Sequence, residues 1–168
     1  MLRTDGTFAY QGIYMSHAHG WATGPAAALS QRVLGLRPLG VSADGPGDFA
    51  VEPTAVSGLT FCNGSASFGG GRVELSWAAG GGSSFRLDLD ASGAPPGAVA
   101  RIGLPIPPAL DETALTLRAD GAEIWRAASG PVAAAAATSG VDAGAARVAR
   151  GRLWLELAEA RALRLELQ

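Results

Sequence analysis

From about residue 48 to the C-terminus, apolar and polar residues alternate in short segments that are separated by glycine and proline. Val, Leu and Trp occupy every second position of residues 73–77, and Phe, Leu and Leu do so in residues 85–89. Side chains of a strand point alternately to the two faces of a sheet, so this pattern predicts strands with one buried face. The glycine run at 80–82, between the two segments, predicts a hairpin turn.

The same alternation recurs through the rest of the chain. Further strands are predicted at residues 49–52, 59–62, 99–104, 115–118, 123–126, 147–149, 152–157 and 163–167. The last two contain good helix formers, but their leucines alternate strictly, which favours strands. Successive strands separated by turns predict an all-β fold, an antiparallel, jelly-roll-like β-sandwich.

One short helix is predicted ahead of the strands, within residues 25–38. Thr23 or Gly24 can cap its start, and Pro25 suits a first helical turn, where no N–H partner is lost. Gly35 is placed to end it. A helix of this length needs packing partners, so its apolar stripe should contact the sandwich or an upstream part of the protein. The predicted stripe consists of Leu29, Val33 and Leu36.

Composition excludes several classes of function. The 13 basic residues are all arginine, the net charge is −2, and no basic cluster occurs, so nucleic acid is not an expected partner. No apolar run approaches the roughly 20 residues that a membrane span needs. The opening segment also lacks the apolar core of a signal peptide, which indicates a cytoplasmic start if Met1 is the true start. Cys62, the only cysteine, is expected to be a buried free thiol.

The stretch over residues 16–53 contains uncommon elements in a fixed order. They are Ser16, His19-Gly20-Trp21, Thr23-Gly24-Pro25, Val33-Leu34-Gly35-Leu36-Arg37-Pro38 and Phe49-Ala50-Val51-Glu52-Pro53. The series resembles the segment that ends the six-hairpin helical barrel of α-L-rhamnosidases and leads into their C-terminal β-sandwich. The resemblance covers roughly residues 10–90. It implies that residues 1–38 are a remnant of the catalytic barrel and that residues 39–168 are the C-terminal sandwich domain.

The resemblance implies a parent enzyme that removes terminal α-L-rhamnose with inversion. This chemistry needs a general acid and a general base on opposite sides of the glycosidic bond. In the family both acids lie in the barrel, upstream of the part that this chain matches. The only adjacent acidic pair here, Asp111 and Glu112, is expected in a solvated turn. We therefore expect little or no activity from the chain alone.

Two residues of the motif are candidates for substrate binding. The resemblance implies that His19 lines the rhamnose pocket, where an imidazole can hydrogen-bond a sugar hydroxyl; packing of the barrel floor is the alternative, and it is favoured for Trp21. His17 and His19 would share one face of an extended segment, but without a third ligand we expect no metal and no cofactor. The expected partners are an upstream helical barrel and, with it, a rhamnose-containing glycan.

Two other functions stay open. A free-standing carbohydrate-binding module would present aromatic rings, and Trp125 and Trp154 fall opposite the apolar stripe of their strands, unless both cover a second buried face. An uncovered helix stripe would instead suit an oligomerisation domain. Asn63-Gly64-Ser65 is an N-glycosylation sequon without an assigned role, and residues 131–139 are predicted to form a surface loop.

Overall fold

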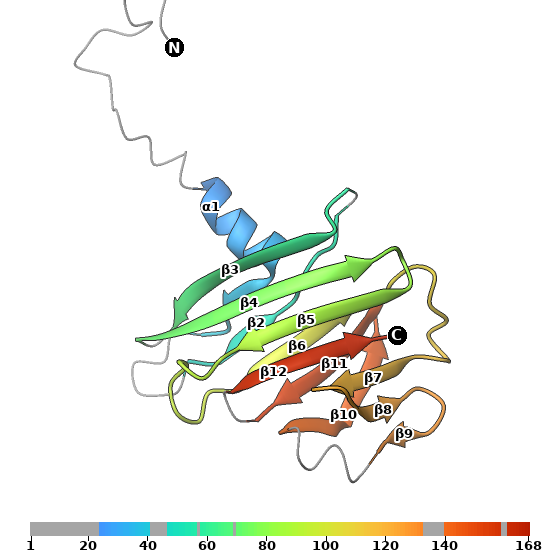
Figure 1. Cartoon of the computed structure of the whole chain (residues 1–168). Coiled ribbons are helices and arrows are strands. Elements are labelled where there is room, and N and C mark those ends of the chain that lie inside the picture. Colours follow the sequence, from blue (N-terminus) through green and yellow to red (C-terminus); the bar gives the residue numbers. More distant parts are fainter. Residues whose placement is uncertain (1–23, 41–46, 57, 69, 133–139, 159–160) are drawn as a thin grey trace, which may run out of the picture.

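Two β-sheets packed face to face form the protein, with one short helical segment at an open edge (Figure 1). The computed structural model describes residues 24–40, 47–56, 58–68, 70–132, 140–158 and 161–168. Within these residues no helix is long and apolar enough to cross a membrane. The predicted all-β, antiparallel sandwich preceded by a short helix is confirmed.

The smaller sheet has five strands and lies behind the larger one in Figure 1. In spatial order they are β1 (Leu36–Pro38), β2 (Phe49–Val51), β6 (Ala100–Pro105), β11 (Arg152–Leu157) and β10 (Val141–Ala149). β2 and β6 run parallel, and the other neighbours are antiparallel. β1 was not predicted, because Leu36 was assigned to the helix.

The larger sheet has seven strands, all antiparallel to their neighbours. In spatial order they are β3 (Phe61–Phe68), β4 (Gly71–Gly80), β5 (Ser84–Asp90), β12 (Ala162–Leu167), β7 (Thr116–Ala119), β8 (Ala122–Arg126) and β9 (Gly130–Pro131). The predicted hairpin turn is residues 81–83. The predicted loop at 131–139 begins inside β9 and otherwise lies outside the described residues.

The core lies between the sheets and is built from the alternating residues that the sequence pattern singled out. Leu165 of β12 is fully buried and lies between Leu87 of β5 and Ala119 of β7 in the strand register. The rings of Trp77 and Phe85 stack with centroids 5.7 Å apart. Each fully buried leucine contributes about 1.5–3 kcal/mol by leaving water, so the two inner faces hold the sandwich together.

The helical segment ends as predicted but packs differently. α1 (Gly24–Ala28) continues into η3 (Leu29–Leu34), a π-helical turn. Gly35 ends it with φ +88° and donates its N–H to the Ser30 carbonyl at 3.1 Å. This i→i+5 hydrogen bond widens the turn.

The predicted apolar stripe is therefore wrong in two of its three members. Leu29 is 60% exposed, and Leu36 is not helical but opens β1 and is buried. Leu34 takes the packing role instead, because the wider turn directs it onto edge strand β3, against Gly64. The helical segment thus shares the core of the sandwich.

Replacing Leu165 by Ala should lower the free energy of unfolding by about 2–5 kcal/mol, because it leaves a cavity in the middle of the larger sheet. Urea denaturation followed by circular dichroism measures the change. Arg118→Gln, an exposed change on neighbouring β7, is the control and should shift stability by no more than about 0.5 kcal/mol. If both variants were equally stable, Leu165 could not be buried in the observed strand register.

Replacing Gly35 by Ala should destabilise the protein by about 2 kcal/mol or more, since a side chain there is strained and collides with the backbone just after β2. Its Cβ would lie 2.3 Å from the Glu52 carbonyl carbon. Gly24→Ala is the matched control: its Cβ meets nothing within 4 Å, so stability should be unchanged or slightly higher. Thermal unfolding of the two variants tests the expected contrast.

Candidate functional site

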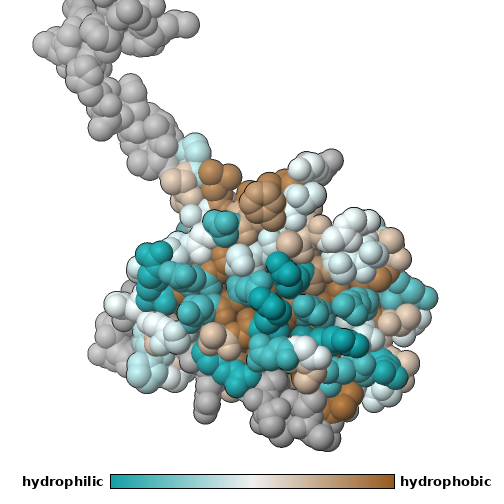
Figure 2. Space-filling view, in the orientation of Figure 1, coloured by the Kyte–Doolittle hydropathy of each residue, from teal (hydrophilic) through white to brown (hydrophobic). Residues whose placement is uncertain are grey.

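The outward side chains of β3, β4, β5 and β12 in the larger sheet form a largely hydrophilic surface, which faces the viewer in Figure 2. Their inward neighbours on the same strands are buried, so alternation places the polar residues outside. We call this surface the polar face. It consists of Asn63, Ser65, Glu74, Ser76, Asp88, Asp90, Arg164 and Glu166.

The strand register arranges these residues in rows that cross the sheet. One row runs from Asn63 through Ser76 and Asp88 to Arg164. The row beside it combines the two carboxylates Glu74 and Asp90 with small side chains at its ends. Because the serines and glycines are short and the flanking side chains are long, the surface is hollowed, with a volume of about 940 Å³. A hollow of this size is comparable to known ligand sites.

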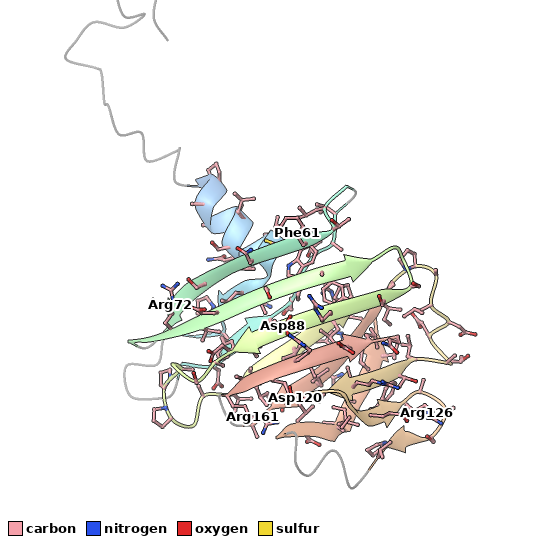
Figure 3. All side chains as sticks on the ribbon, viewed as in Figure 1. Phe61, Arg72, Asp88, Asp120, Arg126 and Arg161 are labelled. Atoms are coloured by element: carbon pink, nitrogen blue, oxygen red, sulfur yellow. The ribbon has the colours of Figure 1, made fainter. Side chains whose placement is uncertain are left out.

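Asp88 is the central charge of the hollow. Its Oδ1 accepts a hydrogen bond from Arg164 Nε at 2.5 Å, and its Oδ2 lies 3.4 Å from Arg86 Nε. The hydrogen bond and charge of Asp88 raise the pKa of Arg164 above its ordinary value. All three side chains are partly solvated, so these pairs orient the groups more than they stabilise the fold. Figure 3 shows Asp88 in the middle of the sheet.

The rim of the hollow is also held in place. At one end, Asp120 Oδ1 accepts the backbone N–H of Arg164 at 2.9 Å, and its Oδ2 lies 4.0 Å from Arg161 Nη2. At the other end, Arg72 Nε donates to Glu74 Oε1 at 2.9 Å. Five acidic and two basic residues line the hollow, and two further arginines, Arg86 and Arg161, pair with Asp88 and Asp120, so acidic groups outnumber basic ones by one. Fixed acceptors in a negative hollow suit a ligand that brings hydrogen-bond donors.

The described carboxyl groups with shifted pKa values do not fit acid catalysis. Hydrogen bonds from the Ser92 hydroxyl and N–H lower the pKa of Asp90. Those from the Thr113 N–H and hydroxyl lower the pKa of Asp111. A glycosidase general acid needs the opposite shift. Nor does the part of the chain that the structure describes contain a group of three or more His, Cys, Asp or Glu able to hold a metal ion.

Several predicted residues can now be placed. His19, Trp21 and His17 lie outside the described residues, so their assigned roles stay predictions. The acidic pair Asp111 and Glu112 is exposed beside a turn, as expected. Cys62 is half-buried rather than buried, because β3 is an edge strand.

The prediction that Trp125 faces away from the core is wrong. Trp125 is only 7% exposed and belongs to the core. It pairs with Leu117, and the register between β7 and β8 shifts directly after this pair. The irregularity lets two consecutive residues, Ile124 and Trp125, both face inward, which strict alternation does not allow.

Trp154 does lie opposite the leucines of β11, but it is half-buried. Its ring covers Gly103 of β6, where a Cβ would approach the ring to 2.9 Å. Its Nε1 donates to the Ala149 carbonyl at 3.1 Å. The ring therefore packs against its own sheet, and less of its surface is available to stack on a ligand than in a fully exposed aromatic side chain.

Sequence reasoning did not identify the polar face. Each of its members is an outward residue of an amphipathic strand, a position that usually means only solvent exposure. The row centred on Asp88 exists because β12 pairs with β5 across 76 residues, a pairing that no local signal indicates. The nearest available signal was the unusual density of carboxylates and arginines on β5 and β12.

Comparison with known proteins shows what the fold resembles. No protein-family model and no curated protein sequence matches the chain. Among solved structures it is similar to the α-L-rhamnosidase from Dictyoglumus thermophilum, with TM-score 0.59 and 14% identity over 84% of this chain. It is likewise similar to the Streptomyces avermitilis α-L-rhamnosidase complexed with L-rhamnose, with TM-score 0.60 and 15% identity over 99% of this chain. The matched part is 13% of each rhamnosidase chain.

These likenesses agree with the resemblance noted in the sequence. At 14–15% identity they establish a shared fold with a portion of each rhamnosidase. The chain spans about one eighth of the length of those proteins, so most of what makes up a rhamnosidase corresponds to nothing in it.

Replacing Ser92 by Ala should raise the pKa of Asp90 towards the ordinary carboxyl value, because the hydroxyl hydrogen bond is lost. A lowered pKa contributes stability that is fully present above the ordinary value and is lost as the pH falls through the lowered one, so the variant loses stability at neutral pH and less in acid. Carboxyl-carbon NMR titration measures the shift. Thr113→Ala should raise the pKa of Asp111 and leave the pKa of Asp90 unchanged. If Thr113→Ala shifted Asp90 instead, the assigned hydrogen bonds would be wrong.

Proposed function

We propose that the protein is a non-catalytic, C-terminal β-sandwich portion of an α-L-rhamnosidase-like glycoside hydrolase. The observation that carries the proposal is the coverage: the match to a rhamnosidase structure covers 99% of this chain and 13% of that enzyme. The ordered motif at residues 16–38 supports the same assignment, because it resembles the junction between barrel and sandwich in that family.

The chemistry of the described residues supports a non-catalytic role. Inverting hydrolysis needs two carboxyl groups about 6.5–9.5 Å apart across a bound sugar, one of them with a raised pKa. The acids of the polar face lie on an open sheet, and two of them form ion pairs, Asp88 with Arg164 and Glu74 with Arg72. Hydrogen bonds from Ser92 lower the pKa of Asp90, which is the opposite of what a general acid needs.

In this proposal the sandwich packs on an upstream helical barrel and completes its surface. Leu29 is 60% exposed, and Figure 2 shows hydrophobic atoms at the end of the molecule where α1 lies. That end is also where the chain enters the sandwich, at Gly24. The boundary near residue 38 belongs to the proposal, although Leu34 and Leu36 already pack into the sandwich core.

The purified chain should not hydrolyse p-nitrophenyl α-L-rhamnopyranoside above the buffer rate, while the Streptomyces avermitilis α-L-rhamnosidase serves as the positive control. Release of p-nitrophenol is measured at pH 4–8 with roughly micromolar protein, conditions under which enzymes with ordinary turnover are easily detected. Turnover that disappears in Asp88→Asn or Asp90→Asn would overturn the proposal, because it would place the catalytic acids in this chain.

A second test addresses the parent enzyme. In the proposal, the DNA upstream of the codon for Met1 encodes, in frame, a helical-barrel sequence, and the longer product cleaves the same rhamnoside. Deleting the sandwich from that product should reduce its soluble yield or thermal stability, because an apolar surface would be uncovered. A longer product without rhamnosidase activity would count against this assignment.

A further inference from the structure

We propose that the polar face, together with the exposed ring of Phe61, is a binding surface for a neutral oligosaccharide. The proposal concerns a surface that the preceding assignment leaves without a role, and it does not depend on that assignment. It rests on three features of the described residues: an exposed aromatic ring, a polar hollow on the same face, and the charge of that hollow.

Phe61 is the aromatic component. It opens β3 and is 64% exposed, more than any other large apolar side chain in the described part of the chain. Its inward neighbour Cys62 packs against the core, so the Phe61 ring lies on the same outer face as Asn63 and Ser65. A partner that covers the ring removes apolar surface from water, which favours binding.

The distance between the ring and the hollow suits sugar rings. Asn63 is two residues beyond Phe61 on the same strand, which corresponds to about 7 Å along β3. Asn63 lines the hollow, and the row that starts there leads to Asp88. A pyranose has an apolar face of C–H bonds and an edge of hydroxyl groups, so one sugar can stack on the ring while the next reaches the polar groups.

The polar groups are already oriented. Asp88 is held by Arg164, and Asp120 is held by the Arg164 backbone N–H. A carboxylate so held keeps further lone pairs for hydroxyl donors, and little side-chain entropy is lost when a ligand binds. Figure 3 shows Phe61 at the edge strand and Asp88 and Asp120 further across the same sheet.

The charge of the hollow selects against other ligand classes. Its acidic groups outnumber the arginines that line it or pair with its acids by one, so it offers no excess positive charge to phosphates, nucleic acids or acidic polysaccharides. Its outward side chains are mostly charged, hydroxyl or amide groups, and Phe61 is the most exposed large apolar side chain of the described residues, so the face lacks the cluster of exposed large apolar side chains that protein interfaces have at their centre. A neutral polyhydroxylated ligand supplies the donors without charge repulsion.

The test is titration of the full chain by isothermal calorimetry and by amide NMR. The probes are L-rhamnose, a neutral rhamnan, xylan oligomers and mannan oligomers, with polygalacturonate as the acidic comparison. Saturable binding of at least one neutral probe, with amide shifts on β3, β4 and β5, is expected. Affinity should change little between 50 and 500 mM NaCl, because no ion pair forms with the ligand, and polygalacturonate should not bind.

The variants locate the site. Phe61→Ala and Asp88→Asn should each weaken binding about tenfold or more, which corresponds to about 1.4 kcal/mol. Phe61 is exposed, so its replacement should leave the fold intact, and circular dichroism checks this for both variants. Arg126→Gln, which lies at the far end of the same sheet in Figure 3, and Trp154→Phe on the other sheet should bind like the parent.

Three outcomes would overturn the proposal. The first is the absence of saturable binding by every neutral probe. The second is binding that falls with Trp154→Ala but not with Phe61→Ala, which places the site on the opposite sheet. The third is concentration-dependent mass that Phe61→Ala abolishes without any sugar binding, which makes Phe61 a contact between copies of the chain. None of these results concerns hydrolysis of a rhamnoside, so they do not test the proposed function, which has its own experiment.

Discussion

The pairing of the C-terminal strand β12 with β5 and β7 is the interaction on which the rest of the molecule depends. Leu165 is opposite Leu87 on one side and Ala119 on the other, and all three are buried. Without β12, the hairpin of β4 and β5 and the hairpin of β7 and β8 would not belong to one sheet. The pairing with β5 joins residues more than 70 positions apart, so its burial has to offset the entropy of closing a long loop.

The same pairing creates the candidate site. Side chains alternate across a sheet, so the register that buries Leu165 also places Arg164 beside Asp88 on the outside. A slip of one residue would expose the leucines and bury the charges, which makes the register strongly determined. The ion pairs of the polar face therefore need not contribute much stability, because packing of the core already places their side chains next to one another.

The function divides into two physical questions. Cleavage of a glycosidic bond requires opposed acids in a closed site, and the described carboxylates of the polar face lie instead on an open sheet, two of them paired with arginines. Binding of a sugar requires only an apolar ring and oriented polar groups, which Phe61 and the hollow beside it provide. The chain shares its fold with about one eighth of each rhamnosidase, which fits the proposed non-catalytic role. Sugar binding by the polar face is tested separately.

The sequence by itself determined the features that depend on local chemistry. Period-2 alternation located most strands, the glycine run at 80–82 marked a hairpin, and Gly35 ended the helical segment through its positive φ. Only the tertiary structure decided the others. Because of the π-helical turn, Leu34 and not Leu29 or Leu36 packs the helical segment onto the sandwich. The irregular register between β7 and β8 places the side chain of Trp125 in the core. The polar face required β12 to meet β5, because long-range register is set by which apolar faces pack together, and no neighbouring residue in the chain encodes that choice.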